Sequence, residues 1–327
     1  GNLLQFWEDE GQYWDAWNIN PNYADRPVSE VVMTCLRTME QGEVRSVVRV
    51  EWQFRSSHFS QDYILERESP VLKIATRVDW QERHIFVKAA FPLNLSAEFA
   101  TYEIACGAIA RPTQPQTPAD RAKWEVPALH WADLTQAETY GVSLLNDSKY
   151  GYDAQPDGLR LSLLRGSTWP DPKADLGIHH FTYAIYPHAG SWQAAGTVRR
   201  GYELNQPLLV RSLPPASETA SFPPHLELCQ ISAENFILMA LKQSEDRPDR
   251  WVLRGYECHG EAGELKLGGD LNWAIVAPAL NLLEEGGNDE AIVDLQQQIV
   301  QIDSWKIISL MCECGRLGRS RTNAFIR

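Results

Sequence analysis

The sequence predicts an all-β protein whose antiparallel strands pack as a sandwich. Three observations support this prediction. Apolar and polar residues alternate with a period of two in many short segments, which is the pattern of strands with one buried face. β-Branched and aromatic residues are plentiful, with 12 Trp and 11 Tyr in 327 residues. Gly, Pro, Asn and Asp punctuate the gaps between these segments, as expected for turns.

The alternation defines the expected strands of the first two thirds of the chain. Residues 48–54 alternate strictly, and so do residues 72–80 from Leu72 to Trp80. The same pattern returns at Leu159, Leu161 and Leu163 and at Phe181, Tyr183 and Ile185, and a further strand is expected at residues 141–145. Successive strand side chains point to opposite faces, so each segment is expected to be half-buried, and an antiparallel sandwich accommodates many such strands economically.

A linker is predicted at residues 211–224, where Leu213-Pro214-Pro215-Ala216-Ser217 is followed by Pro223-Pro224. It would separate a large sandwich at residues 1–210 from a smaller one at residues 225–310. Short strands are expected in the smaller domain, and they fall at residues 236–241, 251–256 and 264–267.

Two further segments are less regular. Helical signals are weak throughout, and residues 284–302 are the best helix candidate, although Gly286-Gly287-Asn288-Asp289 is more simply a loop. Residues 311–327 are rich in Gly and Arg, and we expect a disordered tail there.

Charge and hydropathy exclude two classes of partner. The formal net charge is -13, and Lys and Arg form no basic stripe apart from the short terminal group Arg316, Arg319 and Arg321, so nucleic acid is not an expected partner. No run of 18 apolar residues is present, so no membrane span is expected. The chain begins with Gly and enters directly on an aromatic-rich stretch, which suggests a piece of a longer polypeptide.

Cysteine and histidine patterns predict no metal site. The six cysteines are scattered and lie mostly in apolar segments, which favours buried free thiols in a reducing compartment, the cytoplasm. Cys312 and Cys314 are too closely spaced for a standard zinc knuckle. His179 and His180 are neighbours on an expected strand, so their side chains point apart and do not readily share one metal.

The segment from residue 146 to 153 is the best candidate for contact with a sugar. It joins two expected strands and combines amide, carboxylate, ammonium and phenol groups, which exchange hydrogen bonds with hydroxyls, while aromatic rings suit the apolar faces of sugars. The alternative is a structural turn, in which Asn and Asp cap backbone groups and Gly151 takes a positive φ. The candidate substrate-binding residues are Asn146, Asp147, Lys149, Tyr150, Tyr152 and Asp153.

No catalytic residue is assigned. Adjacent carboxylates such as Asp9 and Glu10 define no catalytic pair, and a solvated acidic surface accounts for them. Asp171 and Asp175 stand near Trp169 and could line a groove, but Trp169-Pro170-Asp171-Pro172 is first of all a turn.

Several unbroken stretches, in order, resemble the C-terminal region of glycoside hydrolase family 38 α-mannosidases. One is Tyr13-Trp14-Asp15-Ala16-Trp17, and another is Thr76-Arg77-Val78-Asp79-Trp80. The longest runs from residue 141 to 153 and contains Leu144-Leu145-Asn146-Asp147. Further stretches lie at residues 111–113, 123–134, 161–188 and 256–260, so the resemblance covers roughly residues 2 to 310.

This resemblance implies a specific organisation. Family members resemble three-part enzymes, in which an N-terminal α/β domain holds an Asp nucleophile and a zinc ion, and a helical bundle follows. A galactose-mutarotase-like β-supersandwich and smaller β-sandwich material complete them. This chain matches the last portion, with a supersandwich that is possibly incomplete at its N-terminus. The zinc-binding and nucleophile motifs have no counterpart in it.

The leading hypothesis is therefore a hydrolase component. The expected partners are the chain's own N-terminal catalytic domain, which would bring the zinc, and a mannose-containing glycan; this chain would support the former and line the outer groove for the latter. Two alternatives remain open: a stand-alone carbohydrate-binding β-sandwich, which exposed Trp or Tyr would mark, and a purely structural scaffold.

Overall fold

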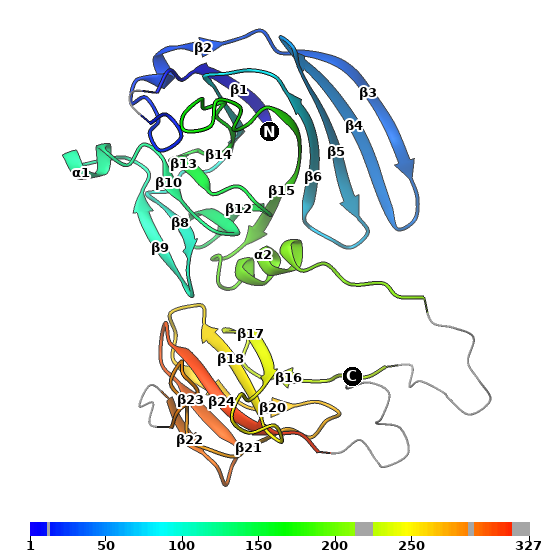
Figure 1. The fold of residues 1–327 in the computed structure, drawn as a ribbon, viewed down its shortest axis with the longest axis vertical. Coiled ribbons are helices and arrows are strands. Elements are labelled where there is room, and N and C mark those ends of the chain that lie inside the picture. Colours follow the sequence, from blue (N-terminus) through cyan, green and yellow to red (C-terminus); the bar gives the residue numbers. More distant parts are fainter. Residues whose placement is uncertain (12–13, 213–224, 287–290, 316–327) are drawn as a thin grey trace. The chain divides into compact units, whose positions relative to one another are not determined.

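The all-β prediction is confirmed by a computed structural model that describes residues 1–11, 14–212, 225–286 and 291–315 (Figure 1). Every strand pairing within the described ranges is antiparallel. The described helices are short: η1 (Tyr23–Asp25), α1 (Pro118–Arg121) and α2 (Thr197–Asn205). In this part of the chain no helix has the length and apolar character needed to cross a membrane.

The chain divides into two compact units, and each is described by itself. The first comprises Gly1–Ile104 and Ile109–Pro207, and the second comprises Ala105–Ala108 and the chain from Leu208 onward. Most of the linker expected at residues 211–224 lies outside the described residues, so the division into 1–210, 211–224 and 225–310 stays a prediction.

A nine-stranded sheet forms one layer of the first unit, in the order β3-β4-β5-β6-β15-β12-β11-β8-β9 (Figure 1). The long strands β15 and β6 pair from Gly177 opposite Trp80 to Ile185 opposite Leu72. The strands are β3 (Val32–Gln41), β4 (Arg45–Phe54), β5 (Ser57–Glu66), β6 (Leu72–Trp80), β8 (Phe99–Ile104), β9 (Gly107–Pro112), β11 (Trp131–Gln136), β12 (Tyr140–Asn146) and β15 (Gly177–Ala189).

A six-stranded sheet forms the other layer, in the order β10-β13-β14-β7-β1-β2. Its central strand β7 is buried along almost its whole length. The strands are β1 (Leu3–Glu8), β2 (Pro27–Val28), β7 (Ile85–Pro92), β10 (Val126–Pro127), β13 (Gly151–Gln155) and β14 (Gly158–Leu164).

The core of the first unit lies between these two sheets. The six-stranded sheet contributes Val87 and Leu161, and the nine-stranded sheet contributes Ile74 and Leu144, all of them fully buried in one cluster. Each of these residues lies on the inward face of its strand, which the period-two alternation of apolar residues selects. Burial of the inward faces stabilises the packing of the two sheets.

The second unit is a smaller sandwich with its own core. Leu253 and Leu310 of a four-stranded sheet meet Leu265 and Val300 of a three-stranded sheet in one buried cluster. A two-stranded ribbon pairs β16 with β20. The strands are β16 (Gln230–Ile231), β17 (Phe236–Gln243), β18 (Trp251–Glu257), β19 (Gly263–Leu265), β20 (Leu267–Gly268), β21 (Ala274–Ile275), β22 (Ala291–Asp294), β23 (Ile299–Ile302) and β24 (Ile307–Glu313).

Two local expectations are corrected. The helix considered for residues 284–302 is wrong, because β22 and β23 pair there as a hairpin; the alternation of Ala291, Val293 and Val300 toward the core decided it. The expected disordered tail is wrong for residues 311–313, because they belong to β24, where Met311 and Cys312 are buried. Residues 316–327 lie outside the described residues.

Candidate functional site

The predicted sugar-contact segment is the connection between β12 and β13, and its first residue faces inward. Asn146 is buried, and its side-chain amide donates to the carbonyl of Leu129 at 2.8 Å and to the hydroxyl of Tyr152 at 2.5 Å. Its side-chain oxygen Oδ1 accepts from the backbone N–H of Lys149 at 2.7 Å. Asn146 therefore shapes the turn, and its polar groups are committed within the domain.

Two more of the six predicted residues also lie inside the domain. Tyr152 is fully buried, where loss of hydration raises its pKa. The carboxylate of Asp153 is buried as well and pairs with Lys88 and Arg160. The structure therefore does not bring Asn146, Tyr152 and Asp153 to a surface that a sugar could reach.

The other three predicted residues lie on the outside of the turn. Asp147 is exposed, and its carboxylate accepts from the N–H of Thr182 at 2.8 Å. Tyr150 is 57% exposed. The ammonium of Lys149 stands 4.4 Å from the ring centroid of Phe181. Partial burial lowers the pKa of Lys149, against the raising effect of the carboxylates of Asp175 and Asp147.

A buried ionic cluster lies beneath this turn. Lys88 on β7 is fully buried and pairs with Glu125 and Asp153, while Arg160 donates to Asp153 at 2.6 Å. Burial alone would lower the pKa of Lys88, but the two carboxylates outweigh it and raise that pKa. Two cations and two carboxylates balance in charge, and the Lys88 ammonium also lies 4.7 Å from the ring centroid of Phe86.

A cluster of three exposed tryptophans is a feature that the sequence did not reveal. Trp14, Trp17 and Trp169 are 58%, 67% and 48% exposed. The ring of Trp169 lies between the other two, with centroid distances of 6.0 Å to Trp14 and 5.5 Å to Trp17. We call these three residues the tryptophan cluster.

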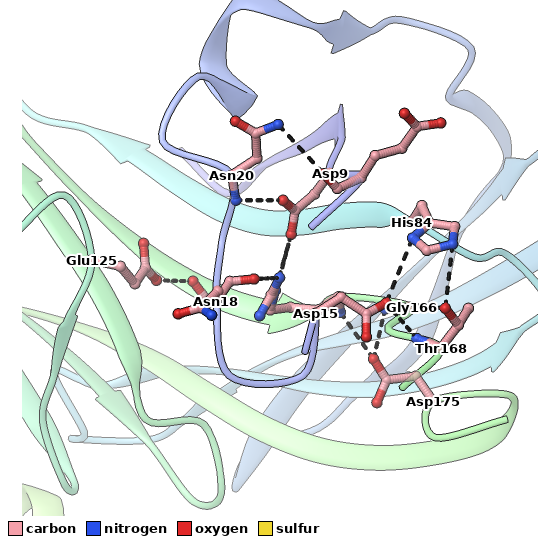
Figure 2. Close-up of polar contacts among 12 residues, drawn as sticks. Asp9, Asp15, Asn18, Asn20, His84, Glu125, Gly166, Thr168 and Asp175 are labelled. Atoms are coloured by element: carbon pink, nitrogen blue, oxygen red, sulfur yellow. Dashed lines mark hydrogen bonds and ion pairs between the residues drawn. The ribbon is translucent and has the colours of Figure 1, made fainter. Parts of the chain in front are cut away.

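The carboxylate of Asp15 joins the loop that carries Trp14 and Trp17 to Thr168 (Figure 2). It accepts from the backbone N–H groups of Thr168 and Trp169, both at 2.7 Å, and from the Thr168 hydroxyl at 3.1 Å. Burial would raise its pKa, but these hydrogen bonds, with a contribution from His84, hold the pKa below its ordinary value. Because Asp15 stands between Trp14 and Trp17 in the sequence, this bond places Trp169 against both rings.

A second carboxylate, that of Asp9, fixes the base of the same loop (Figure 2). It accepts from the N–H of Asn20 at 2.8 Å and pairs with the guanidinium of Arg165 at 2.5 Å. The same guanidinium group donates to the carbonyl of Asn18 at 2.7 Å. Both ends of the loop that carries Trp14 and Trp17 are therefore held by Arg165, the residue that follows β14.

A third carboxylate, that of Asp175, orients the segment that carries Trp169 (Figure 2). It accepts from the N–H groups of Gly166 and Arg165 at 2.7 and 3.1 Å. Asp175 thus fixes the start of the segment that carries Trp169.

The sequence held a partial signal for this region. Trp14-Asp15-Ala16-Trp17 and Trp169 were each visible, but Asp15 and Thr168 are 153 positions apart, and only the fold makes them neighbours. Asp175 acts through backbone N–H groups within the segment, which agrees with the turn expected there.

Metal-binding groups do not converge in this structure. Among the described residues, no group of three or more His, Cys, Asp or Glu side chains is arranged to hold a metal ion. His179 is engaged with the carbonyl of Asp175 at 2.6 Å, and Cys312 is buried in the core of the second unit. The residues present therefore do not fit a zinc ion.

Comparison with known proteins identifies both units. Residues 1–173 match the model of the glycosyl hydrolases family 38 C-terminal domain, and residues 235–310 match that of the family 38 C-terminal beta sandwich domain. Human alpha-mannosidase 2C1 is 38% identical over 80% of this chain, and alpha-mannosidase G of Dictyostelium discoideum is 35% identical over 80%. The chain spans about a quarter of the length of these relatives, 25% and 24%.

A solved structure shows the same fold. The crystal structure of an alpha-mannosidase from Enterococcus faecalis superimposes with a TM-score of 0.78 over 94% of this chain and 38% of that one, at 13% sequence identity. The family models account for both sandwiches in chain order, and the resemblance found in the sequence stretches is confirmed. The chain belongs to glycoside hydrolase family 38 and corresponds to the C-terminal β-domains of that family.

Proposed function

We propose that this chain is the C-terminal part of a retaining, zinc-dependent α-mannosidase that hydrolyses α-linked mannose in oligosaccharides. The observation that carries the proposal is the match to both C-terminal family models in chain order, together with relatives that are named α-mannosidases and extend about three quarters of their length beyond this region. In this proposal, the N-terminal catalytic region supplies the nucleophile and the zinc, and this chain packs against it.

The contribution of this chain to substrate binding would be at the rim of the site. Asp147, Lys149 and Tyr150 present a carboxylate, an ammonium and a phenol on the outside of the β12–β13 turn. These groups can exchange hydrogen bonds with the sugars beyond the cleaved bond, while the buried Asn146, Tyr152 and Asp153 hold the turn in shape. No step of the reaction is assigned to a residue of this chain.

A reducing compartment is part of the proposal. None of the six cysteines forms a disulfide; they are Cys35, Cys106, Cys229, Cys258, Cys312 and Cys314. Six unoxidised thiols persist where thiols are kept reduced, which favours the cytoplasm.

The test uses the complete coding sequence. The full-length protein should hydrolyse an aryl α-mannoside and release mannose with its α-configuration retained, as followed by NMR of the anomeric proton. A zinc chelator should abolish the activity, and added zinc should restore it. Inversion of configuration, or full activity in chelator, would contradict the proposed chemistry.

A second candidate function is a stand-alone carbohydrate-binding module, which the exposed tryptophan cluster favours. The two functions are separated by the coding sequence upstream of Gly1. An in-frame family 38 catalytic domain there supports the first, and a chain that starts near Gly1 supports the second.

A further inference from the structure

The tryptophan cluster carries an inference that rests on the proposed function and deepens it. We propose that Trp14, Trp17 and Trp169 form a stacking subsite for one hexopyranose ring of a mannose-containing glycan. The subsite would hold a sugar that is not the one cleaved, since this chain is assigned no reacting group.

The composition of the cluster favours a sugar over a protein partner. Its apolar surface is made of indole rings, and each ring is about half or more exposed. A large flat ring matches the apolar C–H face of a pyranose, and the indole N–H remains able to donate to a hydroxyl. By contrast, the exposed apolar residues of β3 are aliphatic, namely Val32, Met33, Leu36 and Met39, and that surface has the character of a protein contact.

The cluster is held ready before any ligand binds. Two backbone N–H groups donate to the Asp15 carboxylate, and Asp9 with Arg165 closes the base of the loop. Trp14 has a φ of 60°, a conformation that a bulky residue rarely adopts, and the surrounding bonds enforce it. Rigid aromatic groups lose little entropy on binding, so their contact area is available for affinity.

The surroundings of the cluster are polar, as a sugar site requires. Asp175 accepts from the N–H of Gly166 and orients the Trp169 segment, and the hydroxyl of Thr168, next to Trp169, donates to the carboxylate of Asp15. Hydroxyl groups around a stacked pyranose would find hydrogen-bonding groups on this side of the domain, which sets a polyhydroxylated ligand apart from an apolar one.

The experiment uses the full-length enzyme and this chain in parallel. In the enzyme, Trp17→Ala and Trp169→Ala should lower kcat/KM for α-mannotriose about 2- to 10-fold relative to 4-nitrophenyl α-mannoside. Trp17→Tyr should retain most of the activity, because it keeps an aromatic ring. Trp305→Ala removes a similarly exposed tryptophan, 42% exposed, from the second unit and should leave the ratio unchanged.

In the chain itself, the indole N–H signals of Trp14, Trp17 and Trp169 in a ¹⁵N-Trp spectrum should move when α-mannotriose is added, and those of buried tryptophans should not. If the enzyme hydrolyses no mannoside, the proposed function fails, and this titration alone decides the subsite. Indole signals that do not move on addition of α-mannotriose would overturn the subsite. Equal losses of kcat/KM on both substrates, together with a lowered melting temperature, would also overturn it and would make the cluster a contact with the catalytic region.

Discussion

Lys88 illustrates how a single charged residue can be accommodated inside a sandwich core. Its ammonium has no exposed surface, and the carboxylates of Glu125 and Asp153 replace the water that it loses on folding. Burial raises the pKa of Glu125, an effect that the neighbouring ammonium opposes. The cluster is balanced only while all its members are present, so removing one charge exposes the desolvation cost of the others.

Substitution of Lys88 by Met is expected to lower the free energy of unfolding of the first unit by about 3–5 kcal/mol, because Glu125 and Asp153 both stay buried and Arg160 pairs with Asp153. Urea denaturation measures this change. Lys73→Met is the matched control, since its pair with Glu66 is partly exposed and should contribute less than about 1 kcal/mol. Equal losses in the two variants would contradict the buried-charge argument.

The carboxylate of Asp15 should make stability depend on acid pH. Its pKa in the folded chain lies below the ordinary value of 3.8, so its contribution to stability is complete above about pH 5 and is lost progressively as the pH falls through 3.8 toward the folded pKa. The difference in unfolding free energy between the natural chain and Asp15→Asn should therefore shrink between about pH 5 and pH 2.5. A difference that stays constant over this range would show that the carboxylate charge is not what holds Thr168 and Trp169.

At the scale of elements, the β12–β13 turn separates two roles in one short segment. Asn146 and Tyr152 hold the turn from inside, and Asp147 and Tyr150 face outward. Substitutions on the two sides should therefore have different consequences, and stability and substrate preference can be measured independently.

In the full-length enzyme, Tyr150→Ala should reduce kcat/KM on a natural oligosaccharide more than on a small aryl mannoside. A small substrate has few sugars beyond the cleaved bond, so a lost rim hydrogen bond of about 0.5–1.5 kcal/mol matters only for the longer one, by a factor of roughly 2 to 13. Tyr152→Ala is the control, because it should lower the melting temperature without a substrate-dependent effect. An unchanged ratio for Tyr150→Ala would assign the whole turn a structural role.

The pairing of β17 with β18 depends on a residue without a side chain. Gly255 lies opposite Leu238, and a Cβ atom there would overlap the ring of Phe236 and the carbonyl oxygen of Ile237. The carbonyl belongs to the neighbouring strand, so it cannot move without breaking the ladder. Close approach, rather than backbone freedom, explains the glycine.

Gly255→Ala should consequently destabilise the second unit by about 1–3 kcal/mol. Gly286→Ala provides the comparison within the same unit, because nothing lies within 4 Å of its Cβ position, and the change should stay within about 0.5 kcal/mol. Thermal unfolding of the two variants measures both values. If Gly255→Ala unfolds like Gly286→Ala, the strands can separate more easily than the packing indicates.

At the scale of the whole molecule, two sandwiches with separate cores match the two C-terminal models of family 38. The chain spans 25% of the length of the human relative. In the proposed function, the activity requires an N-terminal catalytic region, and the exposed aliphatic residues on β3 offer a surface for contact with it.

This chain by itself should therefore show no turnover of an aryl α-mannoside above the buffer rate, even with added zinc. After dialysis, elemental analysis should find well under one zinc per chain, because the described residues contain no group of three or more His, Cys, Asp or Glu side chains arranged to hold a metal ion. Clear turnover, or one tightly held zinc, would mean that part of the catalytic machinery lies in this region.

Much of the fold could be predicted from the sequence because the pattern that determines it is local. A period of two from Leu72 to Trp80 selects one buried face regardless of which strands become neighbours, and β6 confirms it. Short strands carry a weaker signal, and the hairpin of β22 and β23 is not apparent from the sequence, because its apolar residues gain a buried face by packing against the four-stranded sheet.

The candidate site divides in the same way. The sequence by itself determined the fold class, the family and the β12–β13 turn, because these rest on stretches of contiguous residues. Only the tertiary structure decided which polar groups of that turn reach the surface and that Trp169 lies between Trp14 and Trp17. The physical reason is that burial and long-range hydrogen bonds, such as those of Asp15, depend on segments about 150 positions away, and no local pattern records which distant segment will arrive.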